Sequence, residues 1–154
     1  MSYLLAKTIH ILSSTVLFGT GIGSAYYMWR AHLTRNIPVI ATTVKHVVFA
    51  DWIFTTTSII VQPLSGAWMA YQAGIPLTAL WIWLSLSLYM LAGVCWLPVV
   101  WIQIEIAKIA KECEKNQTNL PERYERLMKI WFLLGIPAFM ALIVVFWLMV
   151  NKPM

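Results

Sequence analysis

The sequence predicts an all-α integral membrane protein, an up-down bundle of four membrane-spanning helices in one domain covering residues 1–154. Two properties of the composition predict this class: 60% of the residues are hydrophobic, and the mean hydropathy is +0.74. The third observation is that the apolar residues occur in long blocks, and about 20 such residues match a hydrocarbon core roughly 30 Å thick. This composition excludes a soluble enzyme.

The first predicted helix covers residues 4–29. Its apolar run is longer than the roughly 7–15 residues of a signal-peptide core, so we expect it to be kept as a membrane helix. Tyr26, Tyr27 and Trp29 precede Arg30, which is the pattern of a membrane–water boundary. We expect a short polar loop from Arg30 to the second helix.

The second predicted helix covers residues 39–71 and follows a proline suited to a first turn. Pro63 lies inside it and should leave the Ile59 carbonyl without its helical hydrogen bond. The third helix covers residues 77–115 and leaves the membrane near residue 104. The fourth covers residues 120–150, with Asn119 as its expected cap.

The basic residues predict the orientation. Four crossings place both termini on one side of the membrane, and that side carries Lys7 and Lys152. The opposite loops carry the other nine basic residues, Arg30, Arg35, Lys45, Lys108, Lys111, Lys115, Arg123, Arg126 and Lys129. The positive-inside rule therefore predicts cytoplasmic loops and periplasmic termini in a bacterial inner membrane. The net charge of +5 reflects this orientation, so we expect a lipid bilayer and no nucleic acid as partner.

His10 is the leading candidate for a functional residue. It belongs to a polar and small-residue seam on the first helix, formed by Lys7, His10, Ser14, Leu17, Gly21, Ser24 and Met28. Ionisable side chains at membrane depth are costly and are by default functional candidates, and imidazole is an axial ligand of b-type haem. Alternatively, His10 donates to a backbone carbonyl, such as that of Ile59. Lys7 either extends outward or binds a haem propionate.

Three further polar residues are candidates. His32 and His46 flank the first loop and could share a metal, or they are simply exposed at the interface. Asp51 is the one acidic residue inside a predicted membrane segment. It either relays protons or binds a cation, or it forms an ion pair with a residue such as Arg30 or Lys45.

Several stretches resemble HemJ-type protoporphyrinogen oxidases. These are residues 7–11, 27–32, 58–68, 81–86 and 135–153. The resemblance implies the four-helix architecture and His10 as a ligand of b-type haem. A lysine of that family in the third helix is absent here, where Ser85 occupies the matching region, so the resemblance does not imply the oxidase activity. Residues 50–54 and 61–66 also resemble a family of bacterial inner-membrane proteins known only as a domain of unknown function.

These observations lead to two alternative functions. In the first, His10 binds b-type haem or a porphyrin-like ligand for redox chemistry or tetrapyrrole handling, with Met69, Met140 or no residue as the second ligand. In the second, the chain is a non-enzymatic membrane subunit or small carrier without a cofactor. Small residues on the first helix leave homo-oligomerisation open.

Overall fold

The computed structural model describes residues 2–153, and all regular structure in that range is helical. The elements are α1 (Tyr3–Thr34), α2 (Ile37–Ala50), the π-helical turn η1 (Asp51–Thr55), α3 (Thr56–Gln72), α4 (Leu80–Asn116) and α5 (Glu122–Asn151). Because α2, η1 and α3 form one continuous rod, the described chain has four rods long and apolar enough to cross a membrane. The predicted all-α four-helix membrane fold is confirmed.

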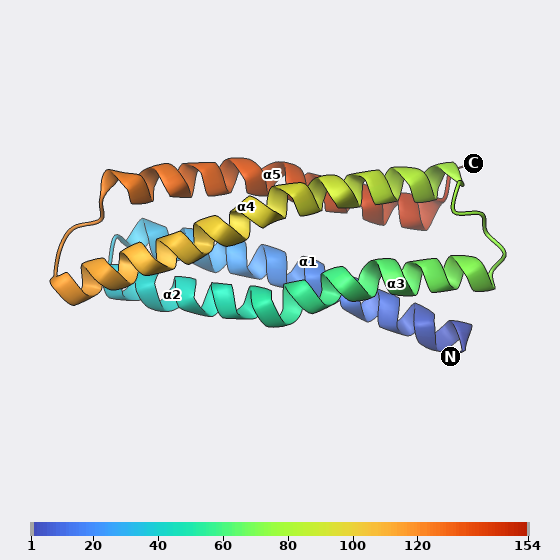
Figure 1. Cartoon of the computed structure of the whole chain (residues 1–154), viewed down its shortest axis with the longest axis horizontal. Helices are drawn as coiled ribbons and strands as arrows, with labels where there is room; N and C mark the ends of the chain where they lie inside the picture. Colours follow the sequence, from blue (N-terminus) through green and yellow to red (C-terminus); the bar gives the residue numbers. More distant parts are fainter. Residues whose placement is uncertain (1, 154) are drawn as a thin grey trace.

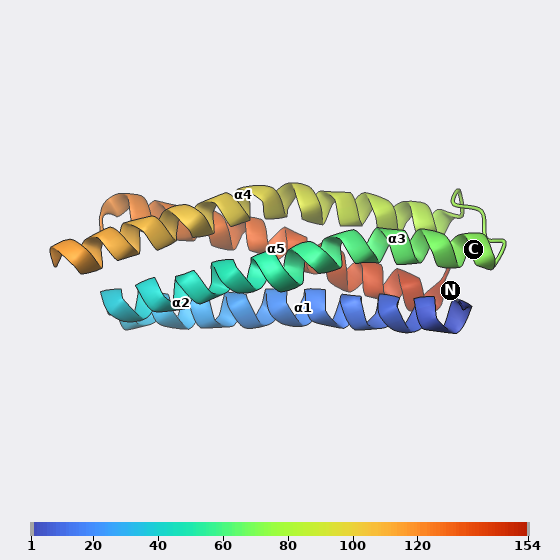
Figure 2. The same ribbon diagram turned by 60° about the horizontal axis from the view of Figure 1, so that its bottom comes forward.

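The four rods form two helical hairpins. One consists of α1 packed along α2, η1 and α3, and the other of α4 packed along α5. Figures 1 and 2 show the N- and C-termini at the same end of the elongated bundle. We call this the terminal end, and the opposite end, with the connections at residues 35–36 and 117–121, the loop end.

The hydrophobic core lies in the loop half of the molecule. There α2 packs against α4 and links the two hairpins. Five large side chains from all four rods are no more than 1% exposed, namely Met28, Ile40, Val44, Ile106 and Tyr124. Close packing of this kind maximises dispersion contacts, which stabilise helix association inside a membrane.

The terminal half is packed more openly. Many of its large apolar side chains are exposed, including Ile60, Leu64 and Val150, as expected for residues that contact lipid. One contact between the hairpins here is aromatic: the Phe18 ring stacks on Phe139 with centroids 4.9 Å apart and meets the edge of Phe146 at 5.4 Å. The bundle is therefore tightly packed at one end and looser at the other.

Several predicted helix boundaries are wrong. The first helix extends to Thr34, so Arg30 and His32 are helical rather than in a loop. Arg35 ends it with a left-handed φ of 54°, and the Asn36 side chain caps α2 by accepting the Val39 N–H at 3.2 Å.

The other ends shift by smaller amounts. α4 begins at Leu80 rather than at residue 77. Pro121 occupies the N-cap position of α5 in place of Asn119, and no side chain caps this helix.

Candidate functional site

His10 lies on α1 against α3. Its Nδ1 is 2.8 Å from the Ser65 hydroxyl, and that hydroxyl is 2.6 Å from the Val61 carbonyl. Because a hydroxyl has one hydrogen, which Ser65 donates to the helix carbonyl, its oxygen accepts from His10 Nδ1–H. In a neutral imidazole this tautomer leaves a free lone pair on Nε2, the form required of a metal ligand.

Gln62 fixes the same stretch of α1 to α3. Its side-chain amide donates to the His10 carbonyl at 2.7 Å and contacts the Ser13 hydroxyl at 2.6 Å. Gly66 follows one turn later, and a Cβ at this position would lie 3.3 Å from His10 Cε1. The α3 sequence therefore supplies both the hydrogen bonds and the space that position the imidazole.

The predicted backbone partner of His10 is wrong. The Ile59 carbonyl, near Pro63, accepts a hydrogen bond from the Tyr89 hydroxyl of α4 at 2.9 Å. His10 instead pairs with a side chain, that of Ser65. Lys7 is exposed one turn before His10, and at i,i+3 it lies on the same face of α1.

Asp51 forms a second polar cluster at the π-helical turn. It is 5% exposed, and its carboxylate accepts a hydrogen bond from the Thr55 hydroxyl at 2.9 Å. Gln103 of α4 lies beside the same carboxylate and is 2% exposed. The expected ion pair with Arg30 or Lys45 does not occur in residues 2–153. Polar neighbours replace it, because Asp51 faces α4 rather than the loop.

A cavity of about 610 Å³ lies between the two hairpins, has an almost entirely apolar surface and is open to the outside, where its lining residues Met90, Val94 and Leu97 are exposed. Asp51, Thr55, Gln103 and Trp131 line it, as does Met140, one of the expected second haem ligands. His10 does not belong to its lining. The structure therefore separates His10 from Asp51 and associates the cavity with Asp51.

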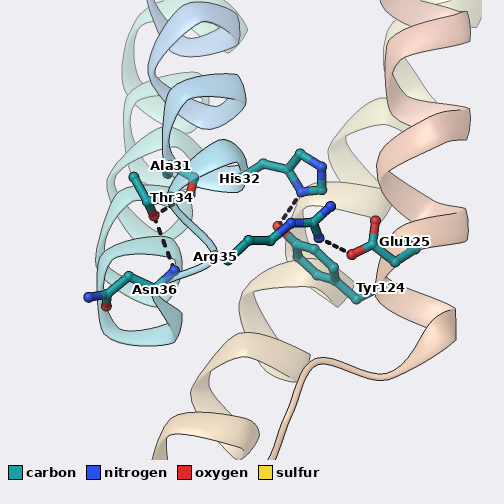
Figure 3. A network of polar contacts seen from close by, with 7 residues as sticks. All are labelled: Ala31, His32, Thr34, Arg35, Asn36, Tyr124 and Glu125. Atoms are coloured by element: carbon teal, nitrogen blue, oxygen red, sulfur yellow. Dashed lines mark hydrogen bonds and ion pairs between the residues drawn. The ribbon is translucent and has the colours of Figure 1, made fainter.

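His32 and His46 are not brought together. His32 Nδ1 is 3.0 Å from the Tyr124 hydroxyl, and the adjacent Arg35 forms an ion pair with Glu125. Figure 3 shows these contacts joining the end of α1 to the start of α5. His46 is exposed on α2. The shared metal site is not supported by this geometry.

The His32–Tyr124 pair lies at the loop end, beyond the apolar spans. Burial is the main cause that lowers the pKa of His32; Arg35 lowers it further and Glu125 opposes the change. Burial also raises the pKa of Tyr124 to about 12. At neutral pH a protonated tyrosine hydroxyl therefore faces a neutral imidazole.

Several residues of these sites were absent from the sequence-based prediction, among them Ser65, Tyr89, Gln103 and Trp131. His10 and the Ile59 carbonyl were expected to pair with each other, but His10 pairs with Ser65 and the carbonyl with Tyr89. Gln103 and Trp131 line the cavity. One signal could have indicated Gln103: it is an amide next to the end of an apolar block, at residue 104. Trp131 carried no signal, because a tryptophan in such a helix is ordinarily a boundary or packing residue.

The fold and these interior polar groups define a polytopic integral membrane protein. The chain belongs to the family described as predicted integral membrane protein (DUF2269), whose model matches residues 4–153. Comparisons with curated proteins and with solved structures gave no match.

Proposed function

We propose that the protein binds b-type haem in the terminal half of the bundle, with His10 Nε2 as axial ligand, for redox chemistry or tetrapyrrole handling. The observation that supports this proposal is the hydrogen-bond chain from His10 Nδ1 through Ser65 to the Val61 carbonyl. Histidines that bind metals commonly donate their second ring N–H in this way, which fixes both tautomer and ring orientation.

The donor set fits haem better than a bare metal ion. A protein site for a bare ion such as zinc needs three or four ligands, and residues 2–153 contain no group of three or more His, Cys, Asp or Glu side chains that could hold one. A porphyrin supplies four nitrogen ligands itself, so one histidine is sufficient. Bound haem would supply one-electron redox chemistry; Ser65 would orient His10, and the exposed Lys7 ammonium would be available to a propionate.

The proposed location is a bacterial inner membrane with the loop end in the cytoplasm. The basic residues support this orientation, because nine of the eleven lie toward the loop end, and Lys7 and Lys152 lie toward the terminal end. His10 would then lie near the periplasmic side.

An optical spectrum of the purified protein tests the proposal. Protein from haem-supplied cells, purified in mild detergent, should show a Soret band that shifts on reduction. His10→Ala should abolish the band, and Ser65→Ala should weaken haem affinity by about ten-fold or more. His46→Ala is the matched control and should leave the spectrum unchanged, since His46 is exposed on another helix.

The alternative function is a membrane subunit or carrier without a cofactor. In that case the only role of His10, Ser65 and Gln62 is to hold α1 against α3. Their hydrogen bonds are as consistent with this structural role as with haem binding. A colourless protein that does not bind added haem would support this alternative and contradict haem binding.

A further inference from the structure

The cavity between the hairpins has unpaired polar atoms at the end nearer the loops. Gln103 Oε1 and Trp131 Nε1 are buried and have no hydrogen-bond partner within residues 2–153. Their residues are 2% and 6% exposed. Native proteins rarely leave such atoms unpaired, so each indicates a partner outside the described chain. These residues are separate from those of the proposed haem site.

The two atoms have complementary hydrogen-bonding roles. The Trp131 indole N–H can only donate, and the Gln103 carbonyl oxygen can only accept. The Gln103 side chain lies beside the Asp51 carboxylate. The carboxylate attracts the NH₂ group of Gln103, so Gln103 Oε1 is left without a hydrogen-bond partner. An occupant that pairs both atoms must therefore carry a group that accepts and donates, which is the property of a hydroxyl.

The rest of the cavity requires an apolar body. About 610 Å³ is available, whereas one water molecule accounts for about 30 Å³. A water could pair the two polar atoms but could not fill the apolar part, and lipid chains entering the open side could fill the apolar part but could not pair the two atoms. A single occupant that does both is a larger molecule with an apolar body and a polar group, which enters from the membrane.

The cavity walls favour a flat ring. Both aromatic side chains and small residues line it, and the set includes Gly21, Gly93, Trp96, Phe132, Gly135 and Phe139. Glycine and alanine leave room beside the helix backbone, and aromatic rings stack on a planar partner. Figure 1 shows the hairpins diverging toward the terminal end. The exposed lining residues Met90, Val94 and Leu97 mark the open side of the cavity, through which the ring can enter from the bilayer.

We propose that this cavity binds a lipid-soluble quinol, one of whose ring hydroxyls accepts from Trp131 Nε1–H and donates to Gln103 Oε1. Asp51, which accepts a hydrogen bond from Thr55, holds Gln103 in the orientation that presents Oε1. The oxidised quinone has a carbonyl in place of this hydroxyl, so it accepts from Trp131 but cannot donate to Gln103. The site therefore favours the quinol.

The indole N–H signals of the nine tryptophans provide the test. Nitrogen-15-labelled protein is placed in lipid nanodiscs under reducing conditions, and decyl-ubiquinol is added. The signal missing from Trp131→Phe belongs to Trp131; it should shift on titration, while that of the lipid-exposed Trp147 stays in place. Persistence of the other indole signals shows that the variant is folded. An unshifted Trp131 signal, or equal shifts of all lipid-facing indoles, would overturn the proposal.

The comparison of quinol with quinone tests the role of Gln103. The wild-type protein should bind decyl-ubiquinol roughly three- to ten-fold more tightly than decyl-ubiquinone, the effect of one hydrogen bond. Gln103→Leu should remove this preference, and His46→Ala should preserve it because His46 is exposed on α2 and does not line the cavity. Equal affinities in the wild-type protein would contradict the assigned hydroxyl contact, whether or not the protein binds haem.

Discussion

In the loop half of the bundle, α2 and α4 meet through fully buried side chains such as Ile40 and Ile106, whereas in the terminal half α1 meets α3 through His10, Ser65 and Gln62. Lipid is as apolar as leucine, so burial by itself stabilises a membrane bundle little. Close fit holds the loop half together, and hydrogen bonds determine which faces meet in the terminal half. The difference indicates that the loop half is a structural anchor, that the proposed haem site lies beyond it and that the cavity begins at its edge, where Trp131 belongs to both.

The largest expected effect comes from removing this fit. Ile106→Ala should lower the free energy of unfolding by about 2 kcal/mol or more, because Ile106 is fully buried and its truncation leaves a cavity. Ile60→Ala is the matched control on α3, where the side chain is 57% exposed, and should cost less than about 0.5 kcal/mol. Thermal unfolding in detergent measures both. Equal losses would show that the two halves are equally packed.

A smaller effect is expected where the hairpins touch in the terminal half. Tyr89→Phe removes the hydroxyl that satisfies the Ile59 carbonyl and should cost about 1 kcal/mol. It should also accelerate hydrogen–deuterium exchange in α3 without affecting α2. Tyr71→Phe provides the comparison, because Tyr71 is 79% exposed. Unchanged exchange in α3 would mean that this hydrogen bond does not join the hairpins.

The smallest effect should be a pH dependence confined to the loop end. The pKa of His32 is lower in the folded protein than its ordinary value of 6.5, so the unfolded chain binds more protons. The contribution of His32 to the free energy of unfolding is therefore fully present above about pH 6.5, and it is lost as the pH falls through the pKa of the unfolded state. The unfolding temperature of wild type should fall between pH 7.5 and pH 5. His32→Gln should reduce this decrease, and the exposed His46→Gln should not.

The architecture could be predicted from the sequence because each rod carries its own signal. A long apolar block indicates a span whatever its neighbours are. The boundaries near Arg30 and His32 were wrong because a membrane limit was taken as a helix limit, and α1 continues beyond the aromatic residues. Membrane thickness limits the apolar segment and not the helix that contains it.

The sites could be predicted only in part, because they depend on how one rod is rotated against another. His10 and Asp51 were identifiable as polar residues in apolar surroundings. Their partners Ser65 and Gln103 lie 55 and 52 positions away in the chain, and nothing in the local pattern relates their faces. Pro63 in the sequence indicated that the Ile59 carbonyl loses its helical hydrogen bond. The sequence could not show that Tyr89, rather than His10, donates to that carbonyl.

The π-helical turn at Asp51–Thr55 relates the two sites to each other. Each residue advances an α-helix by about 100°, so an extra residue in one turn rotates everything that follows by that angle. Asp51 lies before the rotation and faces α4, and Ser65 lies after it and faces His10 on α1. Because Ser65 stands where residue 64 of an unbroken α-helix would stand, deleting the exposed residue Ile53 would straighten the turn and still leave Ser65 facing α1. The extra residue of the π-helical turn thus sets the register of this rod, so that Asp51 faces α4 while Ser65 faces α1.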